Sequence, residues 1–349
     1  MNEKKVLVAM SGGVDSSAAA VLLRQQGYSC DGAMLRLYNG EVEGTCCSAD
    51  DAADARSVAY GLGMKFYVFN ETERFARDVM DRFVAEYCAG RTPNPCLLCN
   101  PNVKFRSLVQ AADRLGCEKI ATGHYARVEQ DEGGIWRVCR PKSDARDQTY
   151  MLYGLGQEVL SRLLLPLGEY QKPEIREIAR QAQLECADSP DSMEICFIPD
   201  GDHAAYIAAR GLHAPAGQFI SPDGKALGPN LGIDHYTVGQ RKGLGLALGR
   251  PAFVREIRPN GDVLLGWSGE EFFRKVWLDH FVTPDGKPLA AGEYLVKIRS
   301  AAKAVPAEWN GSDLLTFTPA VRAPAPGQSA VFYKGDAVVG GGVIERAER

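Results

Sequence analysis

The 349-residue sequence predicts an α/β fold in which a parallel-sheet domain is followed by a small β-rich domain and a C-terminal β-barrel. Apolar strand-like runs alternate with helical patterns in the first third of the chain, which is typical of a parallel sheet covered by helices. From residue 217 the composition shifts toward Gly, Pro and short strands, and from residue 272 the short strands recur at a barrel-like spacing. We therefore expect three domains, at residues 1–205, 206–270 and 271–349.

The first domain begins with a continuous apolar run at residues 6–10, as expected of a strand that is covered on both faces. A Ser-Gly-Gly turn follows, and then a helical pattern over 16–26 that Gly27 ends. The same reasoning predicts strands at 31–38, 65–70 and 119–125, helices at 48–61, 71–88 and 105–115, and a loop at 89–104.

Beyond residue 125 the pattern changes to a β-hairpin, whose strands at 126–130 and 135–140 flank Asp131-Glu132-Gly133-Gly134. Helical patterns return over 147–184, and an acidic loop at 186–202 ends the first domain. The β-rich domain is expected at 217–268. The barrel strands are expected at 293–300, 304–309, 314–318, 329–333 and 337–344.

Composition excludes several classes of protein. Hydrophobic residues make up 45% and charged residues 24%, a globular balance that excludes a disordered or fibrous chain. Forty basic and forty-four acidic side chains give a net charge of −4, so a nucleic acid would have to be held by local basic patches. No apolar run reaches the roughly 20 residues of a membrane span, and no signal-peptide pattern opens the chain. We expect a soluble, cytoplasmic protein without a membrane partner.

The segment Ser11-Gly12-Gly13-Val14-Asp15-Ser16-Ser17 lies between the first strand and the first helix. Glycines let the backbone approach an anion closely, and a helix N-terminus presents unpaired N–H groups. A tight turn with a serine cap is the alternative. A kinase-type P-loop is excluded because no lysine occurs between Lys5 and Lys65, and a dinucleotide Gly-x-Gly-x-x-Gly is absent here.

The remaining motif resembles the PP-loop of ATP pyrophosphatases, which have the adenine-nucleotide alpha hydrolase-like fold. These enzymes cleave ATP to AMP and pyrophosphate while they adenylate a carbonyl oxygen. Asp15 is placed where it could hold Mg²⁺ beside the phosphates.

Ten cysteines are many for such a chain, and without an export signal a disulfide framework is an unattractive explanation. Cys96-x-x-Cys99 is open to three interpretations: a redox pair, half of a metal site, or two inert thiols. A zinc ribbon would need a second Cys-x-x-Cys, which the sequence lacks. Cys196 lies alone in a polar loop. A PP-loop with two remote cysteines is consistent with a carbonyl activated by ATP, sulfur delivered as a persulfide, and a second thiol that resolves it.

The whole chain resembles the bacterial tRNA-specific 2-thiouridylases, which make 2-thiouridine at the tRNA wobble position. The resemblance rests on motifs spread along the sequence: Ser11–Ser17, Cys47-Ser48-Ala49 with Asp54-Ala55-Arg56, Thr92–Asn100 with Lys104-Phe105, Ala121–Tyr125, Asp147-Gln148 with Tyr150, Glu194–Ile198, Tyr236–Gly245 and Pro326–Val331.

The resemblance implies that Cys196 carries the persulfide, that Cys99 attacks it, and that the two then form a disulfide. It implies ATP contacts at Ala9, Met10, Ser11, Gly12, Gly13, Val14, Asp15, Ser16, Leu35 and Gly123, and a pocket for the extruded base at Asn94, Pro95 and Cys96. Contacts with tRNA are implied at His124, Arg146, Asp147, Gln148, Arg299, Ser300 and Gln328. The implied substrates are the tRNAs for Lys, Glu and Gln, and the implied sulfur source is a cysteine desulfurase or a sulfur-relay protein.

Cys96 stands where one well-known version of the family has Asp. Three cysteines near one site suggest a second hypothesis, in which Cys96, Cys99 and Cys196 hold an iron–sulfur cluster with one open iron. Cys46 and Cys47, in an acidic stretch, are interpreted as structural.

Residues 236–258 contain five basic side chains and one acidic side chain, a pattern that indicates a patch tracking the RNA backbone. An ordinary solvated face is the alternative, because the overall charge is negative. Two rival classes of function remain. An amidotransferase-type PP-loop synthetase would not need Cys99 or Cys196, and a non-catalytic RNA-binding module would consume no ATP and tolerate Asp15→Ala.

Overall fold

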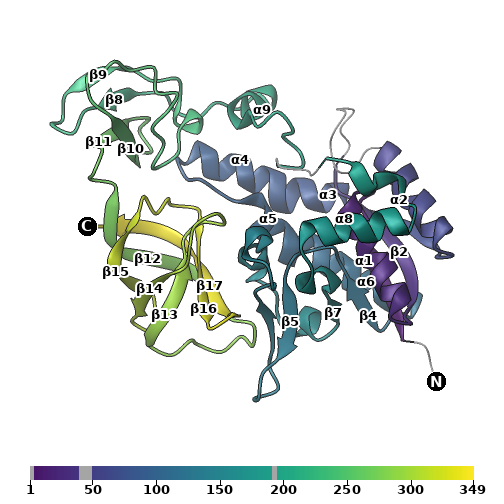
Figure 1. The fold of residues 1–349 in the computed structure, drawn as a ribbon. Coiled ribbons are helices and arrows are strands. Elements are labelled where there is room, and N and C mark those ends of the chain that lie inside the picture. Colours follow the sequence, from purple (N-terminus) through teal and green to yellow (C-terminus); the bar gives the residue numbers. More distant parts are fainter. Residues whose placement is uncertain (1–3, 39–48, 191–194) are drawn as a thin grey trace.

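The computed structural model describes residues 4–38, 49–190 and 195–349. Its three parts follow one another along the chain: an α/β domain, a small β-rich domain, and a β-barrel (Figure 1). The predicted fold class is confirmed. The long helix α4 (Asp81–Cys88, continuing α3) extends from the α/β domain toward the small domain in Figure 1.

A five-stranded parallel sheet forms the centre of the first domain, in the order β3-β2-β1-β4-β7. Its strands are β1 (Lys5–Ala9), β2 (Ser29–Arg36), β3 (Phe66–Asn70), β4 (Lys119–Ala121) and β7 (Leu163–Leu164). Side chains alternate between its two faces: Val6 and Val8 pack with residues of α1 (Val14–Gln25) and α2 (Ala49–Gly61), whereas Leu7 packs with residues of α4 and α6 (Phe105–Leu115). Both faces of the sheet are therefore covered, and ligands have access only at the strand ends.

The segment 89–104, expected to be a loop, is mostly helical. Asn94 caps α5 (Pro95–Cys99) by accepting a hydrogen bond from the Cys96 N–H, and Pro95 occupies the first helical position, where its missing N–H costs nothing. A π-helical turn, η2 (Asn100–Lys104), then joins α5 to α6. The predicted loop is wrong because Pro95 starts a helix here, a position that proline favours.

The helix predicted at 71–88 is present, with a π-helical turn η1 (Ala76–Met80) between α3 (Thr72–Phe75) and α4. The long helical stretch predicted at 147–184 is wrong in detail. It is divided into η4 (Thr149–Leu152), α7 (Gln157–Leu160), strand β7, η5 (Pro166–Glu169) and α8 (Lys172–Gln181). Gly154, Gly156 and Pro166 interrupt the helical pattern.

The predicted hairpin is confirmed as β5 (Arg127–Gln130) and β6 (Trp136–Cys139). Cys139 of β6 pairs with Ala337 of the C-terminal barrel. The hairpin thus extends the barrel sheet into the first domain.

The small domain follows η6 (Glu185–Asp188) and α9 (His203–Ala209) and contains a four-stranded sheet in the order β10-β11-β8-β9. Its elements are β8 (Gln218–Ile220), β9 (Ala226–Pro229), η7 (Ile233–His235), β10 (Ala252–Ile257) and β11 (Val263–Trp267).

The barrel closes because β12 (Phe272–Val282) pairs with both β15 (Leu314–Arg322) and β17 (Ala337–Glu348). Its other strands are β13 (Gly292–Lys297), β14 (Val305–Trp309) and β16 (Ser329–Lys334). Strand β12 was not predicted, since register shifts on both of its neighbours interrupt the alternation of buried and exposed residues.

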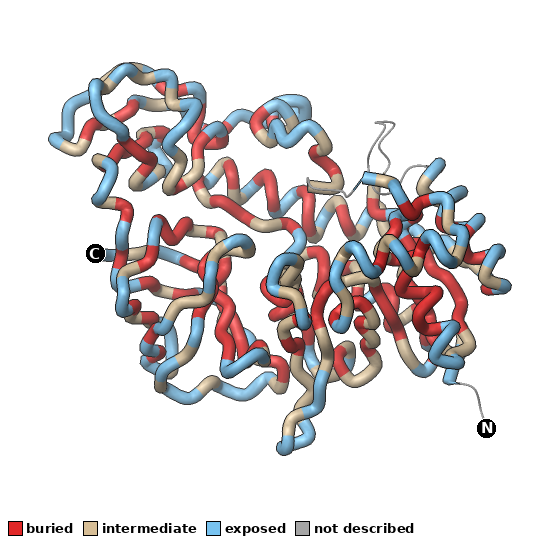
Figure 2. Tube along the Cα trace, in the orientation of Figure 1, coloured by how far each residue is buried: buried red, intermediate tan, exposed pale blue. Residues whose placement is uncertain are grey.

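Buried residues are concentrated along the central sheet, in α4 and inside the barrel (Figure 2). Within residues 4–38, 49–190 and 195–349, no helix is long and apolar enough to cross a membrane.

Candidate active site

The loop between β1 and α1 is held in shape by its own polar groups. The Ser11 N–H donates to the Ser16 hydroxyl at 3.1 Å, and that hydroxyl donates to the Gly13 carbonyl at 3.1 Å. Gly12 has a φ of 80°, which favours glycine, and an added Cβ there would lie 2.9 Å from the Asp51 carbonyl oxygen. The loop therefore delivers the N-terminus of α1 to the end of the sheet in one defined conformation.

Gly123 lies just beyond β4 and sets how closely that strand end approaches α1. A Cβ on Gly123 would lie 2.7 Å from the carbonyl carbon of Asp15 and 2.8 Å from the Ser16 nitrogen. Real side chains do not tolerate such distances, so only glycine lets the two segments meet. The contact places the β4 end against the predicted phosphate loop, where open α/β sheets bind ligands.

A cavity of about 320 Å³ opens at this end of the sheet. It brings together most of the predicted site: Ala9, Met10, Ser11, Asp15, Ser16, Leu35 and Gly123 of the ATP set, Pro95, Cys96, His124 and Gln148 of the RNA set, and the cysteines Cys99 and Cys196. Its wall also includes residues that were not predicted as site residues: Ala33, Met34, Leu37, Phe75, Val79, Asn100, Lys104, Thr122, Ile195 and Phe197.

The remaining predicted residues lie outside the lining. They are Gly12, Gly13 and Val14 in the loop and at the start of α1, together with Asn94, Arg146, Asp147, Arg299, Ser300 and Gln328. Cys46 and Cys47 lie outside the described residues.

Asp15 is held by two side chains that the sequence analysis did not select. The Tyr125 hydroxyl donates to Asp15 Oδ1 at 2.8 Å, and Lys172 Nζ lies 2.7 Å from the same oxygen. The Lys172 side chain, at the start of α8, is only 10% exposed. It thereby supplies the cation that the loop itself lacks. The sequence around Lys172 does not indicate its contact with Asp15, because the two residues are 157 positions apart in the chain.

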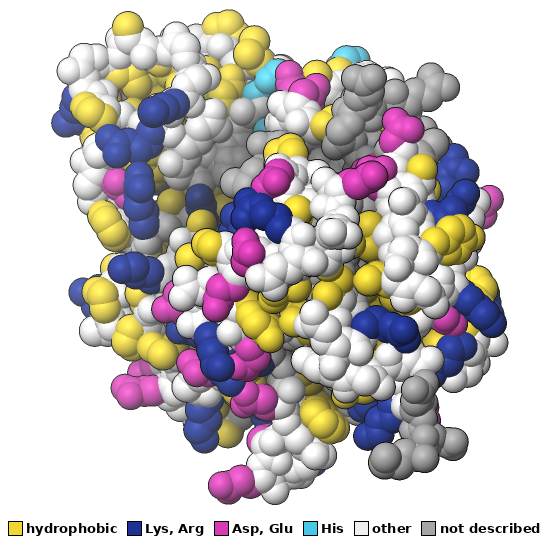
Figure 3. Space-filling view, turned by 45° about the vertical axis from the view of Figure 1, so that its right-hand side comes forward, with side chains coloured by type: hydrophobic (Ala, Val, Ile, Leu, Met, Phe, Trp, Pro, Cys, Tyr) yellow, Lys and Arg dark blue, Asp and Glu magenta, His cyan; other side chains and the backbone are white. Residues whose placement is uncertain are grey.

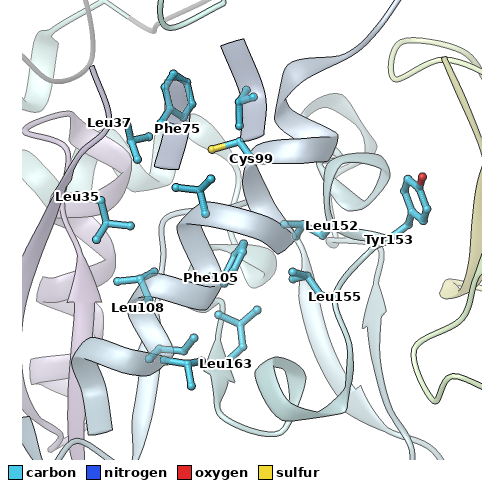
Figure 4. Packing of buried hydrophobic residues seen from close by; sticks show 14 of the residues in the cluster. Leu35, Leu37, Phe75, Cys99, Phe105, Leu108, Leu152, Tyr153, Leu155 and Leu163 are labelled. Atoms are coloured by element: carbon cyan, nitrogen blue, oxygen red, sulfur yellow. The ribbon is translucent and has the colours of Figure 1, made fainter. Parts of the chain in front are cut away.

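Two of the three cysteines are carried by α5. Cys96 is exposed at its start, whereas Cys99, three residues later, is 7% exposed and packs among core side chains. In Figure 4 the Cys99 sulfur points toward the side where Leu37 and Phe75 lie, and both of those residues line the cavity. The Asn100 amide anchors the end of the helix by donating to the Met151 carbonyl at 2.7 Å.

The third cysteine, Cys196, enters from a tight turn. The Ile198 N–H donates to the Ile195 carbonyl at 2.8 Å, which places Cys196 within the turn. The next residue, Phe197, is 2% exposed and makes edge-on ring contacts with Phe75 at 5.6 Å and with Phe83 at 5.3 Å. These aromatic contacts anchor the turn that carries the half-buried Cys196, which lines the cavity.

The iron–sulfur hypothesis can be tested on this geometry. In the part of the chain that the structure describes, no group of three or more His, Cys, Asp or Glu side chains is close enough to hold a metal ion. Cys96, Cys99 and Cys196 line one cavity without forming such a group. The structure therefore gives no support to a cluster held by the three thiols, and the cluster hypothesis stays a prediction.

His124 and Lys104 are polar residues of the cavity lining. They follow β4 and α5, the cysteine helix, respectively in the chain. The His124 ring Nδ1 and the Thr122 hydroxyl share a hydrogen bond of 2.7 Å. Burial, and secondarily the positive charge of Lys104, lowers the pKa of His124 to about 3. The imidazole is therefore neutral at physiological pH, and Lys104 is the positively charged group among the described residues that line the cavity.

Several residues predicted to contact tRNA lie between the first domain and the barrel. Asp147 forms an ion pair of 3.0 Å with Lys297, and their side chains are 7% and 9% exposed. The Gln328 amide donates to the Thr92 carbonyl at 3.1 Å. Arg299 instead joins the barrel to the small domain: it donates to the carbonyls of Ala323 and Val238, and burial lowers the pKa of its guanidinium. Arg146 and Ser300 are half-buried nearby.

The basic segment of the small domain borders a second hollow, which is lined by Arg241, Lys242, Arg250 and the glycine- and leucine-rich residues between them. Figure 3 shows Lys and Arg side chains gathered over this part of the molecule at the upper left. The Arg250 guanidinium stacks on the Trp267 ring at 3.4 Å, which holds one of these charges in place.

A parallel sheet whose first strand leads into a Ser-Gly-Gly-Val-Asp-Ser loop, with a cavity at that loop, defines an ATP-binding enzyme of the PP-loop class. Family models match the chain in three successive segments: a tRNA methyl transferase HUP domain at residues 4–200, a tRNA methyl transferase PRC-barrel domain at 205–265, and an Aminomethyltransferase beta-barrel domain at 275–344. The chain belongs to the family of tRNA-specific 2-thiouridylases, as its full-length relatives show.

One of these relatives is the tRNA-specific 2-thiouridylase of Clostridium perfringens, 46% identical over 359 residues that cover 99% of each chain. The enzyme of the same name from Clostridioides difficile (strain 630) is 44% identical over 360 residues, again 99% of each. Among solved structures, a 4-thiouridine synthetase–RNA complex with bound ATP is a remote likeness, 17% identical with a TM-score of 0.36, covering 54% of this chain and 43% of that one.

Proposed function

We propose that this protein is a tRNA-uridine 2-sulfurtransferase that uses ATP to replace the O2 of the wobble uridine with sulfur. One observation carries the proposal: a single cavity is lined by the loop between β1 and α1, by Cys99 and by Cys196. Adenylation acts on O2 and sulfur transfer acts on C2 of the same carbonyl group, so both kinds of group must reach one place. The full-length relatives named tRNA-specific 2-thiouridylases support the choice of substrate.

ATP is proposed to lie along the ends of β1, β2 and β4. Ala33, Met34 and Leu35 offer an apolar edge for the adenine, and the N-terminus of the twelve-residue helix α1 offers N–H groups to the phosphates. Mg²⁺ typically binds through one or two carboxylates together with substrate phosphates, and Asp15 fits the carboxylate role. Because Tyr125 and Lys172 both bind Oδ1, we expect Mg²⁺ to reach Asp15 through Oδ2.

The target uracil is proposed to enter beside α5, where Pro95 and Cys96 line the cavity and Asn94 caps the helix. Chemistry on a base requires its extrusion from the stack. His124 and Gln148 line the same cavity, and Gln148 is fixed by its side-chain oxygen, which accepts from the Tyr125 N–H at 2.8 Å.

No metal ion is a reactant in the proposed sulfur transfer. Uridine O2 attacks the α-phosphate of ATP, and pyrophosphate leaves. The terminal sulfur of a Cys196 persulfide then attacks C2, and AMP leaves with the former O2. The Cys99 thiolate then attacks the Cys196 Sγ, and the S–S bond of the former persulfide breaks. The outer sulfur stays on C2 as the thiocarbonyl, and a Cys99–Cys196 disulfide remains. The half-buried Cys196 and the buried Cys99 face the cavity from different elements, as this sequence of attacks requires.

The physiological substrates are proposed to be the cytoplasmic tRNAs for Lys, Glu and Gln, with sulfur supplied by a cysteine desulfurase directly or through a relay protein. Lys104 would meet RNA phosphate or AMP at the cavity, and the basic hollow at Arg241, Lys242 and Arg250 would follow the tRNA backbone farther out.

The test combines the protein with ATP, Mg²⁺, a cysteine desulfurase with cysteine, and unmodified tRNA for Glu. We expect AMP and 2-thiouridine to form in equal amounts, as measured by nucleoside mass spectrometry. Asp15→Ala should abolish both products, whereas Cys99→Ser and Cys196→Ser should abolish thiolation. Cys88→Ser, a half-buried cysteine outside the cavity, is the matched control and should retain activity.

Thiolation that survives in the Cys99→Ser/Cys196→Ser double variant would contradict the proposed chemistry and favour a synthetase that adenylates another carbonyl. ATP-independent RNA binding as the sole activity would favour a non-catalytic module. Iron and sulfide analysis of anaerobically purified protein is an additional arm. Stoichiometric iron that activity requires would replace the persulfide route with a cluster.

A further inference from the structure

We propose that Cys96 is a third reacting thiol, which exchanges with the Cys99–Cys196 disulfide after each turnover and moves it to the protein surface as a Cys96–Cys99 disulfide. The inference rests on the proposed function, because it takes the Cys99–Cys196 disulfide as its starting point. It concerns how the enzyme is regenerated rather than how the base is thiolated.

The three thiols differ in their access to solvent although they line one cavity. Cys96 is exposed, Cys196 is half-buried, and Cys99 is only 7% exposed. A disulfide between Cys99 and Cys196 would therefore lie in the cavity wall, where Phe75 and Phe197 cover it from one side. A protein reductant must bring its own cysteine into contact with a disulfide sulfur, and the exposed Cys96 offers a more accessible sulfur than the half-buried Cys196 or the buried Cys99.

Cys96 and Cys99 are placed to form a disulfide with each other. They occupy positions i and i+3 of one helix, α5, and therefore lie on the same helix face. Ideal helix geometry separates such Cα atoms by about 5 Å, which is within the range that disulfides span. Asn94 and Pro95 fix the first turn of this helix, so the spacing is held before any reaction.

The exchange needs no net oxidant. The Cys96 thiol loses its proton to solvent, and the thiolate attacks the Cys99 sulfur of the Cys99–Cys196 disulfide. The Cys96–Cys99 bond forms, the Cys99–Cys196 bond breaks, and Cys196 leaves as a thiolate, ready to accept sulfur again. An external dithiol protein then reduces the Cys96–Cys99 disulfide through the exposed Cys96 and is itself oxidised to a disulfide.

The first experiment maps disulfides in the unmodified enzyme. The protein with its persulfide loaded is mixed with ATP, Mg²⁺ and tRNA, without reductant, for one turnover. It is then acid-quenched, alkylated and digested for mass spectrometry. We expect a Cys96–Cys99 disulfide and an alkylated Cys196. Thiolated tRNA accompanied by a Cys99–Cys196 disulfide alone would overturn the exchange while leaving the proposed function intact, and absence of thiolated tRNA would overturn both.

The second experiment compares Cys96→Ser and Cys96→Asp with the Cys88→Ser control under two reductants. With a thioredoxin-type protein as reductant, we expect both Cys96 variants to lose at least tenfold in multiple-turnover rate and to accumulate the Cys99–Cys196 disulfide. With dithiothreitol, which is small enough to enter the cavity, the loss should be at least threefold smaller than with the protein reductant. An equal loss with both reductants would show that Cys96 acts only in structure or base binding, and would overturn the proposal.

Discussion

The carboxylate of Asp15 shows how a single charged residue depends on distant parts of the chain. Lys172 and Tyr125 bind the same oxygen of Asp15, and the Lys172 side chain is almost fully covered. Only the lysine of this ion pair is covered, since the Asp15 side chain is 33% exposed. Lys172 therefore holds the Asp15 carboxylate in place and offsets its charge.

We expect Lys172→Met to lower the rate of ATP-dependent adenylation at least tenfold, because Asp15 loses the cation that holds it. The measurement is AMP formation at saturating tRNA, together with the dissociation constant of ATP. Lys142→Met is the control, since Lys142 forms an ion pair with Glu169 but is 66% exposed and lies outside the cavity. Equal behaviour of the two variants would remove Lys172 from the ATP site.

His124 allows a pH test at the same scale. Its pKa is lowered to about 3, whereas a free histidine titrates near 6.5, so between these pH values the unfolded chain binds a proton that the folded chain does not. The free energy of unfolding should fall as pH drops through this window, by at most about 1.4 kcal/mol per unit from this residue. Urea unfolding at pH 7 and pH 5 should show a smaller fall in His124→Gln than in the unsubstituted protein. A parallel pH dependence of the two would contradict the lowered pKa.

At the scale of elements, the site depends on how closely β4 and α1 approach each other. Gly123 permits this approach, and the loop from Ser11 to Ser16 then presents the helix N-terminus to the cavity. The cysteine helix α5 faces the same cavity because its π-helical turn η2 connects it to α6, which packs on the sheet. Such turns are frequent at functional sites.

We expect Gly123→Ala to weaken ATP binding at least tenfold, because its Cβ would lie 2.7 Å from the Asp15 backbone and would push α1 away from β4. Gly61→Ala is the matched control: Gly61 lies in helix α2, and its added Cβ would have no atom within 4 Å. Equilibrium dialysis with ATP measures the effect. Unchanged binding in Gly123→Ala would show that the ATP site does not depend on this contact.

At the scale of the whole molecule, the barrel is joined to the segments that flank the cysteine helix. The Tyr150 hydroxyl donates to the Ser329 carbonyl at 2.8 Å, the Tyr153 and Ser329 hydroxyls are 3.0 Å apart, and Gln328 binds the Thr92 carbonyl. The buried pair of Asp147 and Lys297 belongs to the same interface. RNA bound at the barrel would therefore contact a surface that is continuous with the supports of α5.

We expect Lys297→Met or Asp147→Asn alone to destabilise the protein by about 3 kcal/mol, since each leaves a buried partner without its counter-charge. The double variant should recover much of that loss. Urea unfolding at pH 7 measures all three. Thr149 and Lys297 hold the pKa of Asp147 below its usual value in spite of burial, so the stabilisation is present above about pH 4 and is lost as pH falls further. A double variant as unstable as the sum of the two single variants would contradict this coupling.

Much of the first domain could be predicted from the sequence because its strands and helices carry strong local periodicity. The helix at 105–115, the hairpin and the loop at Ser11–Ser17 were all found where the pattern placed them. Strand β7, with only two residues, and strand β12, with its irregular register, have too little local pattern to be found in this way.

The sequence by itself determined which chemical groups are candidates for the site. The glycine-rich loop, its aspartate and the three cysteines can each be identified from a short segment of the sequence. Only the tertiary structure decided which distant groups complete the site. The Lys172 contact with Asp15 and the packing of Phe197 against Phe75 join groups across long stretches of chain. Such contacts depend on packing and burial, which no short segment encodes. For the same reason, the structure and not the motif reveals that Cys96 is exposed and Cys99 is covered.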